Sequence, residues 1–117
     1  MHELALCHSV VAAVEKAALK AKATKISKVA LRVGRESGAL PAALSGSWEI
    51  AVANTLLSGA QLEIEVIAAA VYCPNCARDV EIDEFFALLC PQCGTPTGNI
   101  TRGKEFEIAW VEWESGI

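Results

Sequence analysis

The stretch AQLEIEVIAAAVYCPNC, residues 60–76, joins a β-strand pattern directly to a pair of cysteines. Its first half alternates apolar and acidic residues, with Leu62, Ile64 and Val66 on one face, and this alternation predicts a half-buried strand. The AAAVY segment predicts that the chain continues outward from the strand as a bridge to a second structural unit. The fold therefore depends on which elements precede this strand and on what the cysteines after it bind.

Two matched pairs contain four of the five cysteines, as CPNC (Cys73, Cys76) and CPQCG (Cys90, Cys93). A two-residue gap lets both thiolates of one turn reach a single ion, and the intervening loop lets the second turn close from the opposite side. The spacing thus predicts a tetrahedral zinc site of the zinc-ribbon type, with Gly94 suited to a positive φ after the second pair. Four thiolates leave no open coordination position, which favours a structural role. Spacing alone leaves open a pair of disulfides or an iron–sulfur cluster.

Two elements are predicted before residue 40. Apolar residues recur at steps of three and four through residues 4–23, which predicts an amphipathic helix. Its expected apolar stripe is Leu4, Cys7, Val11, Val14 and Ala18. The segment KISKVALRVG, residues 25–34, alternates instead, so we expect a half-buried strand that ends at Gly34.

A second helix and a third strand complete the pattern. The helix is expected to begin near Pro41, where a missing amide hydrogen costs nothing, and to end near Gly59. Its expected buried stripe is Leu44, Trp48, Ala51 and Leu56. The segment KEFEIAWVEWE, residues 104–114, predicts a strand whose buried face holds Phe106, Ile108 and Trp110. Its alternation breaks between Val111 and Trp113, where we expect a β-bulge.

These elements predict an α+β fold, with two helices packed on a three-stranded sheet and an inserted zinc-ribbon domain. We expect residues 1–71 and 104–117 to form the helix-and-sheet domain and residues 72–103 to form the ribbon. A ribbon of this size cannot bury enough apolar surface to fold unaided, so metal binding is expected to supply much of its folding free energy. The EFFALL segment, with Phe85, Phe86, Leu88 and Leu89, is expected to pack over the metal turns, and a docking surface is the alternative.

Composition limits the function. The 117 residues carry a formal net charge of −4, which lacks the basic excess that phosphate-backbone binding requires. No apolar run approaches the ~20 residues that span a bilayer, and no secretory leader precedes the first helix. We therefore expect a cytoplasmic protein without nucleic-acid or membrane partners. No catalytic constellation is recognisable, so we expect a binding protein and not an enzyme. A zinc-ribbon adaptor, including one associated with nucleic-acid machinery, is the alternative.

The opening MHE places a histidine next to the amino terminus. The terminal amine and the His2 amide nitrogen close one chelate ring, and the His2 amide and ring Nδ1 close a second. A fourth nitrogen can come from the Glu3 amide or from an outside ligand. Tetragonal nitrogen sites favour Ni(II) or Cu(II) over zinc. Glu3 is also explained as an acid facing the positive end of the first helix, so MHE alone carries little weight.

Taken with the cysteine pairs, these residues give the chain a family resemblance. MHELALC at the start, VALRVGRESG before the second helix, GAQLEIE in the second strand, and CPNC followed by CPQCG all resemble the HypA/HybF family of hydrogenase maturation proteins. The match runs essentially from end to end. The resemblance implies a nickel metallochaperone with Ni(II) bound through Met1, His2 and Glu3, and a structural zinc bound by the four paired cysteines.

The resemblance also implies partners: a GTPase that helps to load nickel, and the large subunit of a [NiFe] hydrogenase as recipient. The family often adds a carboxylate in the loop before the second helix. This sequence has Leu40 and Pro41 there, so the nearby Glu36 is the candidate substitute.

Two further residues are expected to be structural. His8 is six positions from His2 and so off the helix face that His2 occupies, which predicts a polar surface histidine. Cys7 falls on the apolar stripe, which predicts a buried thiol.

Overall fold

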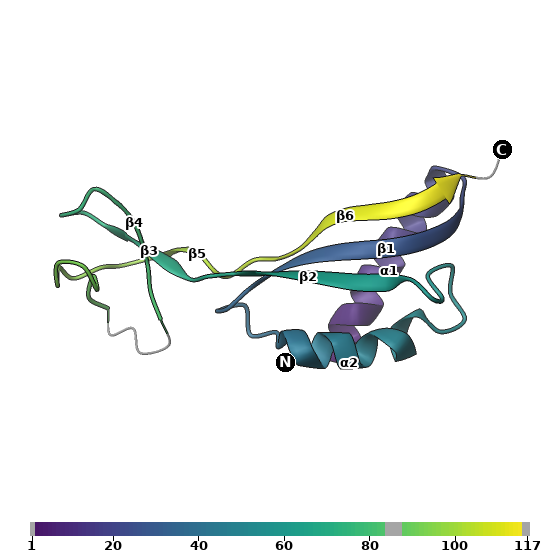
Figure 1. Ribbon diagram of the computed structural model, residues 1–117, viewed down its shortest axis with the longest axis horizontal. Helices are drawn as coiled ribbons and strands as arrows, with labels where there is room; N and C mark the ends of the chain where they lie inside the picture. Colours follow the sequence, from purple (N-terminus) through teal and green to yellow (C-terminus); the bar gives the residue numbers. More distant parts are fainter. Residues whose placement is uncertain (1, 84–87, 116–117) are drawn as a thin grey trace.

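The computed structural model describes residues 2–83 and 88–115. The elements in chain order are α1 (Glu3–Lys20), β1 (Ala23–Gly34), α2 (Pro41–Val52), β2 (Gln61–Ile67), β3 (Ala70–Cys73), β4 (Arg78–Glu81), β5 (Ile100–Arg102) and β6 (Phe106–Ser115). The molecule is elongated, with extents of 57 × 26 × 16 Å. One end carries both helices with β1, β2 and β6, which we call the helix lobe. The other carries β3, β4, β5 and the cysteine turns, which we call the cysteine lobe (Figure 1).

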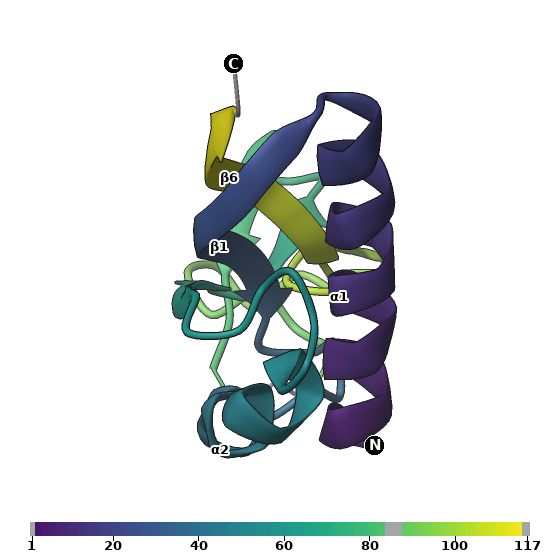
Figure 2. The same cartoon turned by 90° about the vertical axis from the view of Figure 1, so that its right-hand side faces the viewer.

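The sheet of the helix lobe has the order β2-β1-β6. β1 pairs in parallel with β2, because α2 forms the crossover between them, and antiparallel with β6. Both helices pack on one face of this sheet (Figure 2), where their apolar side chains meet those of β1 in a single core. The largest fully buried side chains of that core are Ile26, Leu31, Leu44 and Leu57. The predicted α+β fold is confirmed, and no described helix is long and apolar enough to cross a membrane.

Both helices are shorter than the sequence pattern predicted. α1 ends at Lys20, where the chain turns through Lys22 at φ 58°. α2 begins at Pro41 as expected but ends at Val52, and its last turn is closed by the Thr55 hydroxyl, which donates to the Val52 carbonyl (2.7 Å). Leu56 therefore lies beyond the helix, although it still packs against the core. The predicted stripe is wrong at Leu4, which begins the exposed end of α1 and is 38% exposed.

The buried face of β6 differs from the prediction. Ala30 pairs with Trp110 and Leu31 pairs with Ile108, so Ala109 is an extra residue on β6. A bulge inverts the alternation beyond it, which places Val111 and Trp113 against the core and leaves Trp110 45% exposed. The bulge was expected at 111–113. The burial expected for Ile108 and Trp110 is wrong, whereas Phe106 packs against the core as predicted.

The cysteine lobe is built on a second antiparallel sheet with the order β4-β3-β5. Only residues 68–69 separate β2 from β3, so the strand stretch of the sequence does lead outward into the second unit. Val66, at the end of β2 that leaves the helix lobe, is 45% exposed, so the burial expected for it is wrong. Neither helix covers this end of the sheet (Figure 1).

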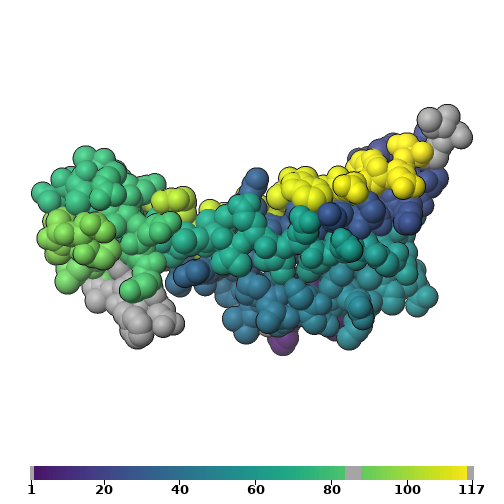
Figure 3. All heavy atoms as spheres, viewed as in Figure 1, coloured from purple at the N-terminus to yellow at the C-terminus, as the bar shows by residue number. Residues whose placement is uncertain are grey.

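A narrow waist joins the two lobes (Figure 3). Its backbone hydrogen bonds run from Gly34 N to Glu105 O (2.7 Å), from Arg35 N to Ile67 O (3.0 Å) and from Glu36 N to Gly103 O (2.7 Å). Gly103 has φ +109°, and a Cβ added there would lie 2.6 Å from the Cα of Ala69. The waist therefore requires glycine at this position, because the three backbone segments cross too closely for a side chain.

Candidate metal centres

The structure brings the four paired cysteines together. Cys73 ends β3 and Cys76 precedes β4, so the first pair occupies the turn of the β3–β4 hairpin. Cys90 and Cys93 occupy a second turn. The four sulfur atoms lie within 4.8 Å of one another, and all four thiols are free of disulfides. Two turns far apart in the sequence thus place four soft donors around one point.

Each turn directs backbone groups at its first sulfur. The Cys76 amide lies 3.3 Å from the Cys73 sulfur, and the Gln92 amide lies 3.4 Å from the Cys90 sulfur. Such N–H groups stabilise a thiolate, which is the form that binds metal. The residue after each second cysteine is left-handed, with φ 54° at Ala77 and φ 77° at Gly94, as predicted for the glycine. The two cysteine turns therefore have the same local geometry, which indicates that both present their sulfur atoms in the same way.

Hydrogen bonding shifts the pKa values of the Cys93 and Cys76 thiols in opposite directions. Contact with Thr95, whose Oγ1 is 3.1 Å from the Cys93 sulfur, lowers the pKa of Cys93 to about 5. Hydrogen bonds with the Cys93 and Cys73 thiols raise the pKa of Cys76 to about 12. The cluster therefore favours a thiolate at one position and a retained proton at another. A divalent ion that prefers tetrahedral sulfur ligation fits this donor set, since it would replace the shared protons.

The expected cover over these turns is not present in the described residues. Leu88 and Leu89 are 62% and 49% exposed, so the prediction that they pack over the metal turns is wrong for them. The backbone at Leu88 is fixed by a hydrogen bond, which the Thr97 amide donates to the Leu88 carbonyl (2.9 Å). Phe85 and Phe86 lie outside the described residues.

The second candidate site lies at the start of α1. Met1 is outside the described residues. His2 is exposed and occupies the N-cap position of α1, where its carbonyl accepts a hydrogen bond from the Leu6 amide (3.1 Å). The first amides of a helix have no carbonyl partner within it. The exposed imidazole and these amides therefore lie together at the start of α1.

The Glu3 carboxylate has a role that the sequence did not predict. Its Oε2 accepts a hydrogen bond from the Leu40 amide (3.1 Å) at the N-cap of α2, and this bond lowers the pKa of Glu3 below its ordinary value of 4.5. The bond joins the first turns of the two helices. No local signal could reveal it, since the two residues are far apart in the sequence.

The remaining candidates are structural or exposed. The Glu36 side chain is exposed, and no hydrogen bond or ion pair joins it to the described N-terminal residues; its amide belongs to the waist. His8 is exposed, as predicted. Cys7 is fully buried and its thiol contacts the Leu44 carbonyl (3.5 Å), and burial raises its pKa, which agrees with the predicted structural role.

Comparison with known proteins places these features in a family context. A family described as hydrogenase/urease nickel incorporation, metallochaperone, hypA matches residues 1–113. A hydrogenase maturation factor HypA of Roseiflexus sp. (strain RS-1) is 41% identical over 97% of this chain and 93% of its own length. The factor of the same name from Streptomyces avermitilis is 37% identical over 99% and 89%, respectively.

Solved structures share the fold. The solution structure of the Ni metallochaperone HypA from Helicobacter pylori superposes with a TM-score of 0.69 at 23% identity, covering 99% of this chain and 100% of that one. A second solution structure, of a HypA protein, superposes with a TM-score of 0.72 at 24% identity, covering 99% and 98%. The arrangement of a helix lobe joined to a cysteine lobe is thus shared with both solved structures.

Proposed function

The chain belongs to the HypA family of hydrogenase/urease nickel-incorporation metallochaperones, and from that premise we propose that it binds Ni(II) at its N-terminus and delivers it during maturation of a [NiFe] hydrogenase. The family consists of metallochaperones and not of enzymes, and its role implies partners in the maturation pathway. The observation that carries the nickel proposal is the exposed His2 at the open first turn of α1.

The proposed nickel ligands are the Met1 amine, the His2 amide nitrogen, the His2 ring Nδ1 and the Glu3 amide. The amides of the first helical turn have no carbonyl partner within the helix, so they can lose their protons and bind the ion without breaking a helical hydrogen bond. A site rich in nitrogen donors suits Ni(II). The Glu3 carboxylate is already bound to the Leu40 amide, so its proposed role is to hold the first turn of α1 against α2 while the backbone binds the cargo.

Zinc is the ion we propose for Cys73, Cys76, Cys90 and Cys93. When bound, it supplies four metal–sulfur bonds that fix the two cysteine turns to each other. The close grouping of four sulfurs and the amide groups directed at two of them support this proposal. We further propose that the chain works as two units, residues 1–71 with 104–117 for nickel and residues 72–103 for zinc.

The proposed partners are a nickel-loading GTPase and the large subunit of a [NiFe] hydrogenase. A protein that passes nickel onward must release it, and an exposed site at a chain end allows a recipient to approach. We therefore expect nickel of moderate affinity that exchanges, beside zinc that does not. The exposure of His2 favours direct transfer to a docked recipient.

Metal titration of the untagged, zinc-loaded protein tests the nickel site. The wild type is expected to bind one Ni(II), whereas His2→Ala and a form with one residue added before Met1 are expected to lose high-affinity binding. His8→Ala is the matched control, because His8 is exposed on the same helix and is not a proposed ligand. Unchanged binding in both altered N-termini would refute the chelate, and zinc alone after nickel loading would favour a scaffold.

The pH dependence of nickel binding provides a second test. The amine and amide nitrogens must lose protons before they can ligate, so affinity is expected to rise as the pH rises from about 6 to 8. Isothermal titration calorimetry across this range measures the effect. A flat profile would argue against nitrogen ligation.

A further inference from the structure

β2 (Gln61–Ile67) is an edge strand, and no other strand covers its outer side in the described part of the chain. It pairs with β1 along its whole length without a register shift. The opposite edge, β6, is interrupted by the extra residue Ala109, and bulges of this kind prevent an added strand from pairing regularly. Of the two edges, β2 is therefore the one that can accept another strand.

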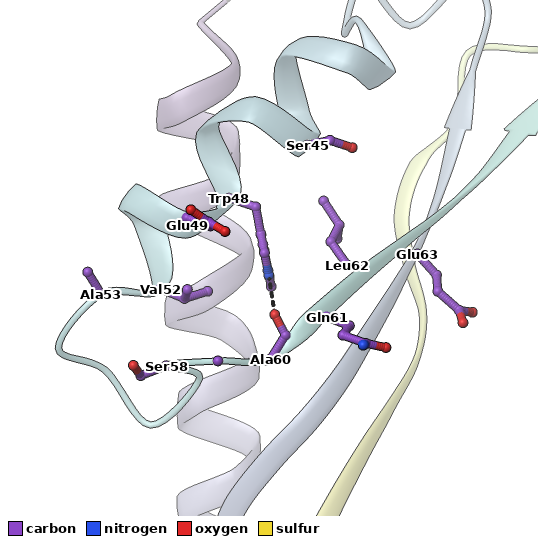
Figure 4. A pocket seen from close by; sticks show the side chains of 11 residues that line it. Ser45, Trp48, Glu49, Val52, Ala53, Ser58, Ala60, Gln61, Leu62 and Glu63 are labelled. Atoms are coloured by element: carbon purple, nitrogen blue, oxygen red, sulfur yellow. Dashed lines mark hydrogen bonds between the residues drawn. The ribbon is translucent and has the colours of Figure 1, made fainter.

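A groove of about 600 Å³ lies between α2 and the start of β2 (Figure 4). Its sides are formed by Ser45, Glu49 and Val52 of α2 and by Gln61, Leu62 and Glu63 of β2. Trp48 lines the groove, and its indole N–H donates to the carbonyl of Ala60 (2.8 Å), which fixes the ring beside the residue that precedes β2. Glu49 is the carboxylate that α2 contributes to the lining, and no lining residue is basic. The groove thus combines an aromatic wall with a negative charge.

The two faces of β2 differ in chemistry. Leu62 and Ile64 face the helices yet are only half-buried, because no strand among the described residues pairs with the outer side of β2. Glu63 and Glu65 face the open side of the sheet and pair with Lys28 (3.2 Å) and Arg32 (3.5 Å) of β1, but their side chains remain 51% and 60% exposed. A neighbouring strand would therefore meet apolar surface at one residue and a carboxylate at the next.

We propose that the β2 edge and the adjoining groove bind an extended protein segment in which apolar and basic residues alternate. The main chain of the segment pairs with β2, its apolar residues cover Leu62 and Ile64, and its basic residues reach Glu63 and Glu65. A second copy of this chain does not fit, because pairing β2 with itself sets carboxylates against carboxylates. This surface lies apart from both metal centres, so its test does not depend on the nickel proposal.

The test uses the zinc-loaded, isotopically labelled full chain and a capped synthetic peptide of about nine residues that alternates lysine and valine. Binding is expected to shift the backbone amide signals of residues 61–67 and the indole signal of Trp48, and to protect β2 amides from hydrogen exchange. A peptide that alternates glutamate and valine is expected not to bind. The double variant Glu63→Gln/Glu65→Gln is expected to weaken binding about ten-fold, since two exposed ion pairs are lost.

The matched control is Glu81→Gln/Glu114→Gln, which removes the same charge from exposed positions on β4 and β6, and binding is expected to stay within about two-fold of the wild type. Equal affinity for the acidic peptide, or amide shifts that centre on β6, would overturn the proposal. No shift in residues 61–67 at millimolar peptide would overturn it as well. A concentration-dependent dimer that protects β2 without peptide would overturn it in favour of a second copy as the occupant.

Discussion

The helix lobe and the cysteine lobe are joined by one waist but are stabilised by different forces. The helix lobe buries a continuous apolar cluster drawn from α1, α2 and β1. The buried cluster of the cysteine lobe, in the described residues, consists of Cys73, Val80 and Cys90, and two of these are proposed zinc ligands. One chain thus contains a lobe that apolar burial can fold and a lobe that we expect to need a metal, because a unit so small cannot offset its loss of conformational entropy by burial alone.

The largest effect is expected from breaking the metal cluster. Cys90→Ser should abolish stoichiometric zinc and unfold the cysteine lobe, because structural zinc contributes apparent binding energies of about 10–16 kcal/mol. The amide spectrum of β3, β4 and β5 should collapse while that of α1 and β1 stays dispersed. Cys7→Ala, outside the cluster, should keep its zinc. A dispersed cysteine lobe in zinc-free Cys90→Ser would show that the lobe folds without metal.

The helix lobe should respond to loss of apolar contact instead. Leu44→Ala removes a fully buried side chain, and the free energy of unfolding should fall by about 2–5 kcal/mol. Urea denaturation followed by tryptophan fluorescence measures this change, with zinc content unaltered. Leu19→Ala, at a position that is 65% exposed on α1, should change stability by less than about 0.5 kcal/mol. Loss of zinc from Leu44→Ala would mean that the lobes do not stabilise themselves separately.

A substitution in the waist tests whether the tight backbone crossing there constrains both lobes. Gly103→Ala forces a Cβ against Ala69 at φ +109°, and we expect a cost of about 1–3 kcal/mol with perturbed amides in both lobes. Gly46→Ala is the matched substitution, because nothing lies within 4 Å of the added Cβ. It should stabilise α2 by about 0.5–1 kcal/mol. Calorimetry compares the two, and equal effects would show that the waist is not constrained.

The smallest effect is expected from the hydrogen bond that joins the two helices, which the Leu40 amide donates to the Glu3 carboxylate. Because the Leu40 amide lowers the pKa of Glu3, the carboxylate stabilises the fold above about pH 4.5, and this contribution is lost as the pH falls through the lowered value. In a pH titration by NMR, the Leu40 amide signal should follow a midpoint below 4.5. Glu3→Gln should remove that titration. A midpoint at or above 4.5 in the wild type would argue against the bond.

Much of the fold was predictable because its signals are local. Alternation identified β1, β2 and β6, and the missing amide hydrogen of Pro41 correctly marked the start of α2. The two cysteine turns followed from spacing, and the positive φ of Gly94 followed from the shape of such turns. Each of these features depends on residues within a few positions of one another, which a single sequence displays directly.

The errors share one cause, which is that burial depends on neighbours from elsewhere in the chain. Trp110 looked buried because alternation was extended through Ala109, whose bulge is visible only in the pairing with β1. Val66 looked buried because alternation places it on the same face as Leu62 and Ile64, yet neither described helix reaches that end of the sheet. An alternating pattern predicts which residues of a strand share a face, whereas only the tertiary packing determines whether that face is buried.

The sequence by itself therefore determined the α+β class, the order of the helices and strands of the helix lobe, and the grouping of four cysteines, since periodicity and ligand spacing are properties of short segments. The tertiary structure alone decided that the Glu3 carboxylate binds the Leu40 amide and that β2 is the regular edge of the sheet, which no other described strand covers. Both depend on contacts, or on their absence, between segments separated by long stretches of chain. Chain topology sets such contacts, and no local pattern encodes them.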